Sequence, residues 1–414
     1  MNVKKHPQLN LNLAIPRTLP PLQPLATLLV FLSVSCSAAA TASLPQTTTA
    51  RTFADWCLNK ANSSVQTQLT IDALLRVAKT TDCNQASSLL SSRTELALGG
   101  NQITDLKPLS SLTHLTILSL IHTQIADLTP LSGLTNLTTL NLDNNRIADL
   151  TPLSELTHLT GLGLSNNQIS DLKPLSGLTH LTGLDLSNNQ IADLKPLSEL
   201  TNLIGLGLTN NQIADLKPLS GLTNLIILRL SNNQIADLKP LSTLVNLTAL
   251  SLGNNQIADL KPLSTLTNLP GLDLSNNQIA DLKPLSTLVN LTQLSLDNNQ
   301  IADLKPLSTL TNLFGLVLNN NQIADLNPLS GLVNLTSLSL SNNSIADLNP
   351  LSGLTNLIIL DLAGNQTLTN KTCPVKPASI CLFVPFQADR NSDSDRNLGY
   401  RRSLLDWNRR SRPR

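Results

Sequence analysis

Aromatic and charged residues are both scarce in this chain. Of its 414 residues, 2% are aromatic and 13% are charged. The hydrophobic core must therefore be aliphatic, and the 41% of hydrophobic residues is ample material for one. Tight protein interfaces concentrate Trp, Tyr and Arg. Their scarcity argues against a single small, high-affinity contact surface.

Sequence signatures of catalysis are also missing. There is no G-x-S-x-G motif, no H-E-x-x-H motif and no phosphate-binding glycine loop. No motif places a serine or cysteine nucleophile beside any of the five histidines, which are His6, His114, His122, His158 and His180. The sequence therefore predicts a protein that is not an enzyme, with no cofactor and no metal site.

The dominant feature of the sequence is a strict repeat. Aspartate recurs every 22 residues, at Asp105, Asp127, Asp149, Asp171, Asp193, Asp215, Asp237, Asp259, Asp281, Asp303, Asp325 and Asp347. A fixed short period of this kind indicates one supersecondary unit stacked many times. Each unit packs against its neighbours, so the array forms a long surface.

One unit, residues 181–202, reads LTGLDLSNNQIADLKPLSELTN. Apolar and polar residues alternate at Leu184-Asp185-Leu186, which predicts a short strand with its leucines inward. Asn189 follows, and its amide can satisfy backbone groups where the chain turns. Leucines then recur every three residues from Leu194, a spacing typical of 3₁₀ turns. Asp193 and the following proline predict the start of that turn, with the aspartate as N-cap.

These residues resemble the leucine-rich repeat, and the I-x-D-L-x-P-L continuation is similar to the 22-residue class of bacterial internalin-type proteins. The resemblance covers residues 96–365 in about 13 copies. It implies an α/β solenoid with short parallel strands on the concave face, 3₁₀ or irregular turns on the convex face and a helical N-terminal cap. At about 4.8 Å between strands, the strand face would be on the order of 60 Å long. Thr123 stands where the other units have the turn asparagine, so a local weakness is expected there.

Charge is unevenly distributed along the chain. Residues 96–365 carry 10 Lys and Arg against 19 Asp and Glu, whereas the segments before and after carry an excess of basic residues. An acidic extended surface excludes nucleic acid as a partner. The aspartate column next to Lys173, Lys195 and their equivalents could bind cations or an anionic polymer. Calcium needs six to eight converging oxygens, however, so turn capping is the favoured interpretation.

The first 42 residues are similar to a secretory signal peptide. Lys4, Lys5 and Arg17 precede an apolar stretch from Leu25 to Val34, and Ala40-Thr41-Ala42 fits a cleavage site. The apolar stretch is too short to span a bilayer as a transmembrane anchor. Cys36 lies in a sequence that faintly resembles a lipoprotein box, so lipid anchoring is an alternative to its removal with the signal. The sequence predicts a secreted, periplasmic or cell-surface protein.

The remaining four cysteines flank the repeats in two pairs. An even number of cysteines in an exported chain favours disulfides, and we expect Cys57–Cys83 and Cys373–Cys381. The alternative, one zinc site made of all four, would require the two ends of the array to meet. Residues 43–95 would form a helical cap, similar to that of exported cyanobacterial leucine-rich repeat proteins, and residues 366–386 a C-terminal cap.

Residues 387–414 are polar and rich in arginine, which predicts a disordered basic tail. The arginines, which could contact an anionic surface weakly, are Arg390, Arg396, Arg401, Arg402, Arg409, Arg410, Arg412 and Arg414.

The variable positions around each strand are the candidate contact residues of the concave face. They are Ile117, Ser119, Ile121, His122, Asn141, Asp143, Asp185, Arg229, Asp273, Asp297, Val317 and Asp361. Weak contacts repeated along the array could give avidity for a protein or a surface glycan. The predicted function is an exported binding or adhesion module. The alternatives are a cytosolic scaffold similar to a leucine-rich repeat phosphatase regulator, and an inert structural spacer.

Overall fold

A computed structural model describes residues 51–100 and 102–384. The expected signal peptide, Cys36 and the expected basic tail lie outside the described residues. Three helices come first, α1 (Phe53–Leu58), α2 (Val65–Ala78) and α3 (Cys83–Ser91). The strands begin at 22-residue intervals: β1 (Glu95–Ala97), β2 (Ile117–Ser119), β3 (Thr139–Asn141), β4 (Gly161–Gly163), β5 (Gly183–Asp185), β6 (Gly205–Gly207), β7 (Ile227–Arg229), β8 (Ala249–Ser251), β9 (Gly271–Asp273), β10 (Gln293–Ser295), β11 (Gly315–Val317), β12 (Ser337–Ser339), β13 (Ile359–Asp361) and β14 (Cys381–Leu382). β14 pairs with β13 one residue out of the repeat register, Leu360 with Cys381.

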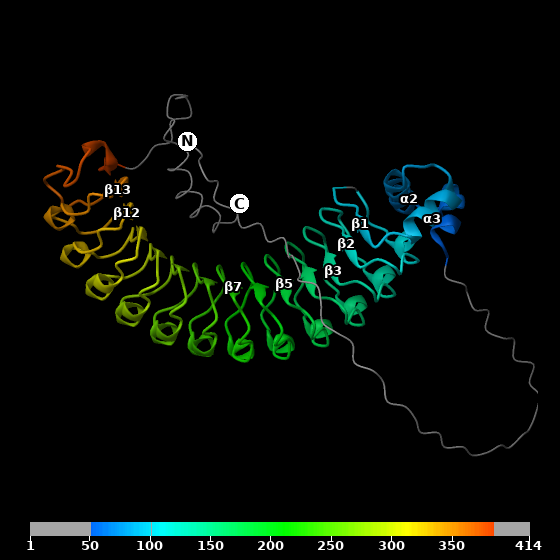
Figure 1. Ribbon diagram of the computed structural model, residues 1–414, viewed down its shortest axis with the longest axis horizontal. Helices are drawn as coiled ribbons and strands as arrows, with labels where there is room; N and C mark the ends of the chain where they lie inside the picture. The colour runs from blue at the N-terminus through cyan, green and yellow to red at the C-terminus, as the bar shows by residue number, and fades with distance from the viewer. Residues whose placement is uncertain (1–50, 101, 385–414) are drawn as a thin grey trace, which may run out of the picture. The chain divides into compact units, whose positions relative to one another are not determined.

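The described strands form one parallel sheet in chain order. Each strand pairs in register with the equivalent residue of the next coil, for example Leu184 with Leu206. A short 3₁₀ helix follows each of β1 to β12, such as η6 (Lys195–Leu197) after β5. Figure 1 shows the consequence, a curved solenoid with strands on the inner edge of the arc and 3₁₀ turns on the outer edge.

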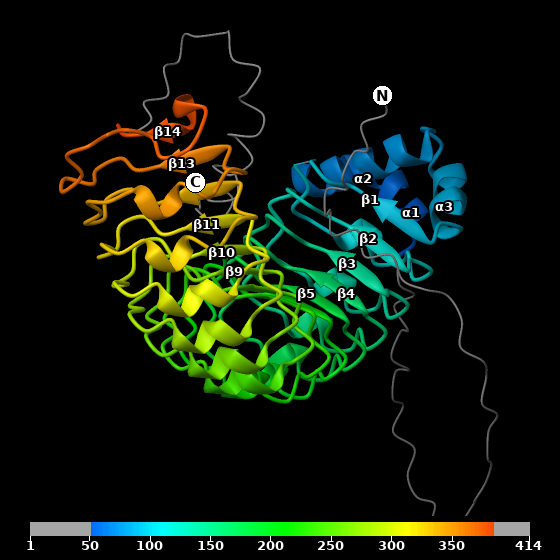
Figure 2. The same ribbon diagram turned by 60° about the vertical axis from the view of Figure 1, so that its left-hand side comes forward.

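The core is a stack of aliphatic layers between these two edges. Each coil contributes an isoleucine and several leucines, and in one coil Leu186, Ile191, Leu197, Leu200 and Leu203 are completely buried. No coil can bury these side chains alone, and each layer is covered only by its neighbours. Figure 2 shows the coils that carry these layers stacked one after another from the cyan to the orange end of the sheet.

The asparagine column joins consecutive coils by hydrogen bonds. The Nδ2 of Asn189 donates to the carbonyl of Leu186 in its own coil and to that of Leu164 in the preceding coil, each at 3.0 Å. Its Oδ1 accepts the N–H of Ile169 at 3.0 Å. The preceding residue, Asn188, has a φ of 57°, a left-handed conformation that Asn tolerates better than most residues.

Thr123 replaces the asparagine in this column, at the position where the sequence predicts a local weakness and not a break. Its hydroxyl lies 2.8 Å from the carbonyl of Leu120 and 2.9 Å from Oδ1 of Asn145, so two acceptors compete for one proton. Within the described residues the Ile103 N–H has no hydrogen-bond partner, although its equivalent Ile125 donates to Asn145 at 2.9 Å. Gln124 also takes a positive φ of 65°, which no other residue of its column does.

The aspartate column stabilises the 3₁₀ turns, but not from the N-cap position that the sequence predicted. Oδ1 of Asp193 accepts the N–H of Lys195 at 2.8 Å, while the N-cap residue itself is Leu194. Pro196 fixes the helical φ in the first turn, and the carboxylate one residue earlier than the cap still reaches the first free N–H.

Both ends carry the expected disulfides. Cys57 is bonded to Cys83, joining α1 to the start of α3, and Cys373 is bonded to Cys381. α2 begins at Val65, because Ser64 caps it by accepting the N–H of Thr67. At the other end the sheet gains a fourteenth strand, β14, where 13 were predicted.

Candidate functional site

The sheet aligns the last residues of the strands in one column on the concave face. In register, Ser119 lies beside Asn141, and Asp185 lies between two glycines, Gly163 and Gly207. Farther along, Arg229 stands between Gly207 and Ser251. The column therefore places the candidate side chains at intervals of one coil along the inner edge of the arc.

The candidates differ in exposure. Ile117, His122 and Arg229 are exposed. Ser119, Ile121, Asn141, Asp143, Asp185 and Asp361 are half-buried, whereas Asp273, Asp297 and Val317 are buried. The three buried side chains offer little surface for a direct contact, a difference that the alternating pattern of the sequence did not indicate.

Several acidic and amide candidates bond to their own coil. Oδ1 of Asn141 accepts the N–H of Asp143 at 2.9 Å, and Asp143 in turn accepts the N–H of Ser165 in the next coil at 2.8 Å. Asp185 accepts the N–H of Ser187 at 3.0 Å, and Asp361 accepts that of Ala363 at 3.1 Å. These carboxylates and amides are occupied in shaping the chain after the strand.

Glycine makes room for two of these groups. A Cβ at Gly163 would stand 2.9 Å from Oδ1 of Asn141, and one at Gly253 would stand 2.9 Å from Oδ2 of Asp273. The polar side chains therefore lean along the sheet over a neighbouring glycine, which buries them.

Asp273, at the end of β9, and Asp297, two residues after β10, are the buried carboxylates among the candidates. Ser275 donates to Oδ1 of Asp273 through both its backbone N–H, at 3.0 Å, and its hydroxyl, at 2.7 Å. Ser295 and Asn298 donate to the two oxygens of Asp297 at 2.9 and 2.8 Å. Burial raises the pKa of the Asp273 carboxyl, and the nearby Asp297 raises it further against the opposing effect of Ser275.

The exposed candidates lie in two separate regions of the concave face. Ile117 and Ser119 of β2 lie next to Thr139 and Asn141 of β3, with His122 just beyond the strand. His122 has a φ of 57° and occupies the column that Asn188 and its equivalents hold in other coils. Arg229 is remote in sequence, on β7, and it is the one basic residue in the described strands.

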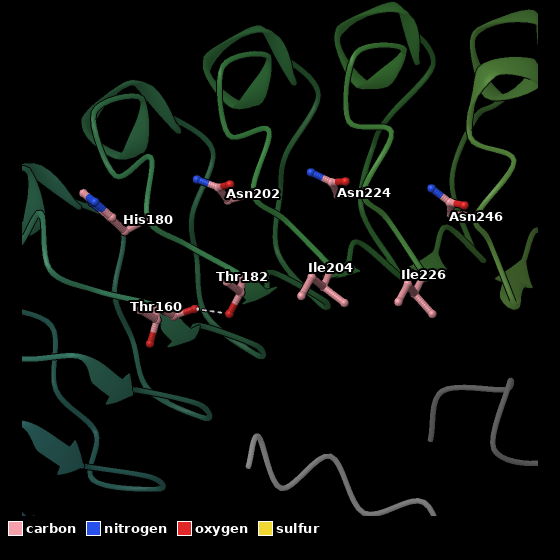
Figure 3. Close-up of a pocket in the computed structure, with 8 residues that line it drawn as sticks. All are labelled: Thr160, His180, Thr182, Asn202, Ile204, Asn224, Ile226 and Asn246. Atoms are coloured by element: carbon pink, nitrogen blue, oxygen red, sulfur yellow. Dashed lines mark hydrogen bonds between the residues drawn. The ribbon is translucent and has the colours of Figure 1, made fainter. Parts of the chain in front are cut away.

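A second surface was missed by the sequence analysis. A groove of about 670 Å³ lies on the flank between the 3₁₀ turns and the strands. It is lined by Thr160, His180, Thr182, Asn202, Ile204, Asn224, Ile226 and Asn246. Figure 3 shows these side chains as two rows, with one member of each row from every coil. The signal was present in the sequence, since isoleucine replaces the usual threonine at positions 204 and 226.

The remaining features concern metals and membranes. Among residues 51–100 and 102–384, no group of three or more His, Cys, Asp and Glu side chains could hold a metal ion. No described helix is long and apolar enough to cross a membrane.

The repeat array matches a known protein family. The family described as "Leucine Rich repeats (2 copies)" matches residues 94–133, 114–155, 157–199, 201–243, 223–268, 245–287, 267–309, 311–351 and 333–372. Comparison with curated protein sequences gives no match.

The similar solved structures include bacterial leucine-rich repeat proteins. An internalin, InlF, from Listeria monocytogenes is 35% identical, with a TM-score of 0.72, over 76% of this chain and 94% of that one. A leucine-rich repeat protein of Leptospira interrogans is 27% identical, with a TM-score of 0.60, over 69% and 88% of the two chains. The functional domain of InlJ from Listeria monocytogenes is 23% identical, with a TM-score of 0.53, over 76% and 81%, and shows the shared fold. The chain belongs to the leucine-rich repeat family, with an internalin-like array of 22-residue units.

Proposed function

We propose that this protein is an exported, non-enzymatic binding or adhesion module whose concave face contacts a protein or a surface glycan. The similarity to an internalin supports a protein-binding module, and the two disulfides are consistent with an oxidising compartment. Export and the choice of the concave face are the parts of the proposal that need a direct test.

The observation that supports binding through the concave face is the exposed side chain of Arg229. Its side chain is exposed at the end of β7, and its neighbours in the column of strand-end residues are Gly207 and Ser251, which present no carboxylate to it. Within the described residues the guanidinium makes no hydrogen bond or ion pair, although the array as a whole is acidic. A planar cation with five donors is suited to a carboxylate or to a pair of hydroxyl groups on a partner.

The second contact region is the patch of Ile117, Ser119 and His122. Ile117 is 37% exposed and gives an apolar surface, and the neighbouring hydroxyl and imidazole groups can donate or accept. Neither region is large. Because both lie on one continuous sheet, an extended partner that meets both would gain from simultaneous contacts.

The test compares three concave substitutions with three convex ones in the full chain. The concave variant carries Ile117→Ala, His122→Ala and Arg229→Ala, and the convex control carries alanine at Lys195, Lys217 and Lys239. Binding of each labelled protein to intact cells of the native host and to its extracted envelope material would be measured over a concentration series. We expect binding to weaken at least about tenfold in the concave variant, the effect of losing about 1.4 kcal/mol, with the convex control unchanged. Equal binding by all three proteins would refute the concave face as the contact surface, and no binding by any of them would support the inert spacer instead.

A further inference from the structure

The flank between the 3₁₀ turns and the strands is free of charge along the whole array. In each coil, five residues cover it, from 112–116 to 354–358 at 22-residue intervals, and none of these twelve segments contains Asp, Glu, Lys or Arg. The exposed large hydrophobic residues of the described array, apart from Ile117, all lie in these segments. They are Ile204, Ile226, Val245, Val289, Phe314, Val333 and Ile358. Exposed apolar groups gathered on one face mark a contact surface.

We propose that the groove in this flank binds a neutral, β-1,4-linked polysaccharide. The proposal concerns a different surface from the concave face and does not depend on the function proposed above. An uncharged lining favours an uncharged ligand, because a charged ligand would lose its hydration without gaining a counter-ion in the groove.

One wall of the groove is a row of fixed amides. Nδ2 of Asn202, Asn224 and Asn246 donates to the backbone carbonyl of Thr179, Thr201 and Thr223 in the preceding coil, at 2.9, 3.0 and 3.0 Å. This bond uses one of the two N–H groups and sets the plane of the amide. The second N–H and the Oδ1 remain, so each coil offers one donor and one acceptor. A sugar hydroxyl is likewise both a donor and an acceptor.

The first member of the row is His180, whose Nδ1 lies 3.1 Å from the carbonyl of Thr157. Because a carbonyl oxygen only accepts, Nδ1 is the donor in this bond, and Nε2 is left for a hydroxyl group, which can both donate and accept. The histidine therefore continues the row as a further hydroxyl-binding group.

The opposite wall combines hydroxyl and aliphatic groups. Oγ1 of Thr182 donates to the carbonyl of Thr160 at 3.1 Å, which leaves its lone pairs to accept (Figure 3). Ile204 and Ile226 follow in the same row, with 44% and 40% of each residue exposed. Pyranose rings carry C–H groups on their faces, and covering isoleucine with them would remove apolar surface from water.

The spacing of the coils favours this polymer over a peptide. Neighbouring strands lie about 4.8 Å apart, and the flank of a curved array is spaced slightly wider than its inner edge. The sugars of a β-1,4-linked chain advance by nearly this step, with alternate sugars turned over, so the same side of the chain returns in step with every second coil. An extended peptide repeats the same side about every 6.7 Å and would fall out of step within two coils. The flank also lacks the Trp, Tyr and Arg typical of protein hot spots.

The experiment is a calorimetric titration of cellohexaose into the full chain, with maltohexaose as the α-linked control. Asn224→Ala removes an amide of the groove. Asn334→Ala is the matched variant, because Asn334 makes the same bond, to Thr311 at 2.9 Å, outside the groove. Both should lose the same stability. We expect cellohexaose alone to bind, Asn224→Ala to weaken binding about tenfold, as for one lost hydrogen bond, and Asn334→Ala to bind as the wild type does.

Three results would overturn the proposal. The first is the absence of binding by the wild type at millimolar cellohexaose, and the second is equal binding of maltohexaose. The third is a self-association, measured by sedimentation, that Ile226→Glu abolishes and cellohexaose leaves unchanged, which would assign the flank to a second copy of this chain.

Discussion

Replacing Thr123 by asparagine is expected to stabilise the array where its inter-coil bonding is weakest. In the next coils an asparagine at this position accepts the N–H of an isoleucine 20 residues earlier, as Asn145 does for Ile125 at 2.9 Å. The N–H of the following residue also donates to the carbonyl of that same isoleucine, as Arg146 does to Ile125 at 2.8 Å. Neither bond is made to Ile103 within the described residues.

The magnitude follows from these two bonds and from Gln124. A hydrogen bond contributes about 1 kcal/mol net, and returning Gln124 from its φ of 65° to an ordinary conformation removes a strain of about 1 kcal/mol. Because repacking the site offsets part of this, we expect Thr123→Asn to gain about 1–3 kcal/mol. The matched control, Thr123→Val, removes the hydroxyl that Leu120 and Asn145 share and should lose about 1 kcal/mol.

Amide hydrogen exchange is the assay, because a repeat array can open locally without unfolding as a whole. In the wild type the Ile103 amide should exchange faster than the Ile125 amide. In Thr123→Asn the protection of Ile103 should rise by about tenfold for each 1.4 kcal/mol gained. If Thr123→Asn leaves the exchange of the Ile103 amide unchanged, or lowers the stability, the missing bonds to Ile103 do not weaken the array at this point.

Three further predictions concern single side chains. Gly207→Ala should cost about 1 kcal/mol in urea unfolding, because its Cβ would displace the carboxylate of Asp185 from the N–H of Ser187. Gly205→Ala, with no atom within 4 Å of its Cβ, should cost nothing, and equal losses would refute the packing argument. Asp273→Asn should stabilise the protein at neutral pH. Since burial raises the pKa of Asp273, its contribution is full at low pH and is lost as pH rises from the ordinary Asp range through the raised value. The Asp273→Asn variant should therefore lose less stability than the wild type over that pH range. A larger loss in the variant would contradict the upward direction of the pKa shift. Asp193→Ala should lower stability by about 1 kcal/mol through the loss of its 2.8 Å turn bond, and no change would show that the bond is replaced by water.

The repeat and the ends of the array were predictable because local signals coincide there. Leucine spacing, the asparagine and the proline of each unit all favour the same coil, and the two cysteine pairs are each close in sequence and in space. The weakness at Thr123 followed from the same reasoning, since a hydroxyl has one proton where an amide has two.

The contact surface was predicted less well, because exposure depends on neighbouring coils. Val317 and Asp273 occupy concave positions that alternate like exposed ones, but adjacent side chains cover them. The groove at Ile204 and Ile226 was missed because the sequence analysis considered only positions around the strands. A single isoleucine in place of threonine becomes a surface feature only when stacking places it next to another.

The claim on which the proposed function depends is that the chain leaves the cytoplasm. The most direct test is the intact mass of the protein secreted by its native host, measured before and after reduction with alkylation. The account predicts a chain that begins at about Ser43, with Cys57, Cys83, Cys373 and Cys381 alkylated only after reduction. A full-length chain with free thiols, recovered from the cytosol, would contradict it and would favour an intracellular scaffold.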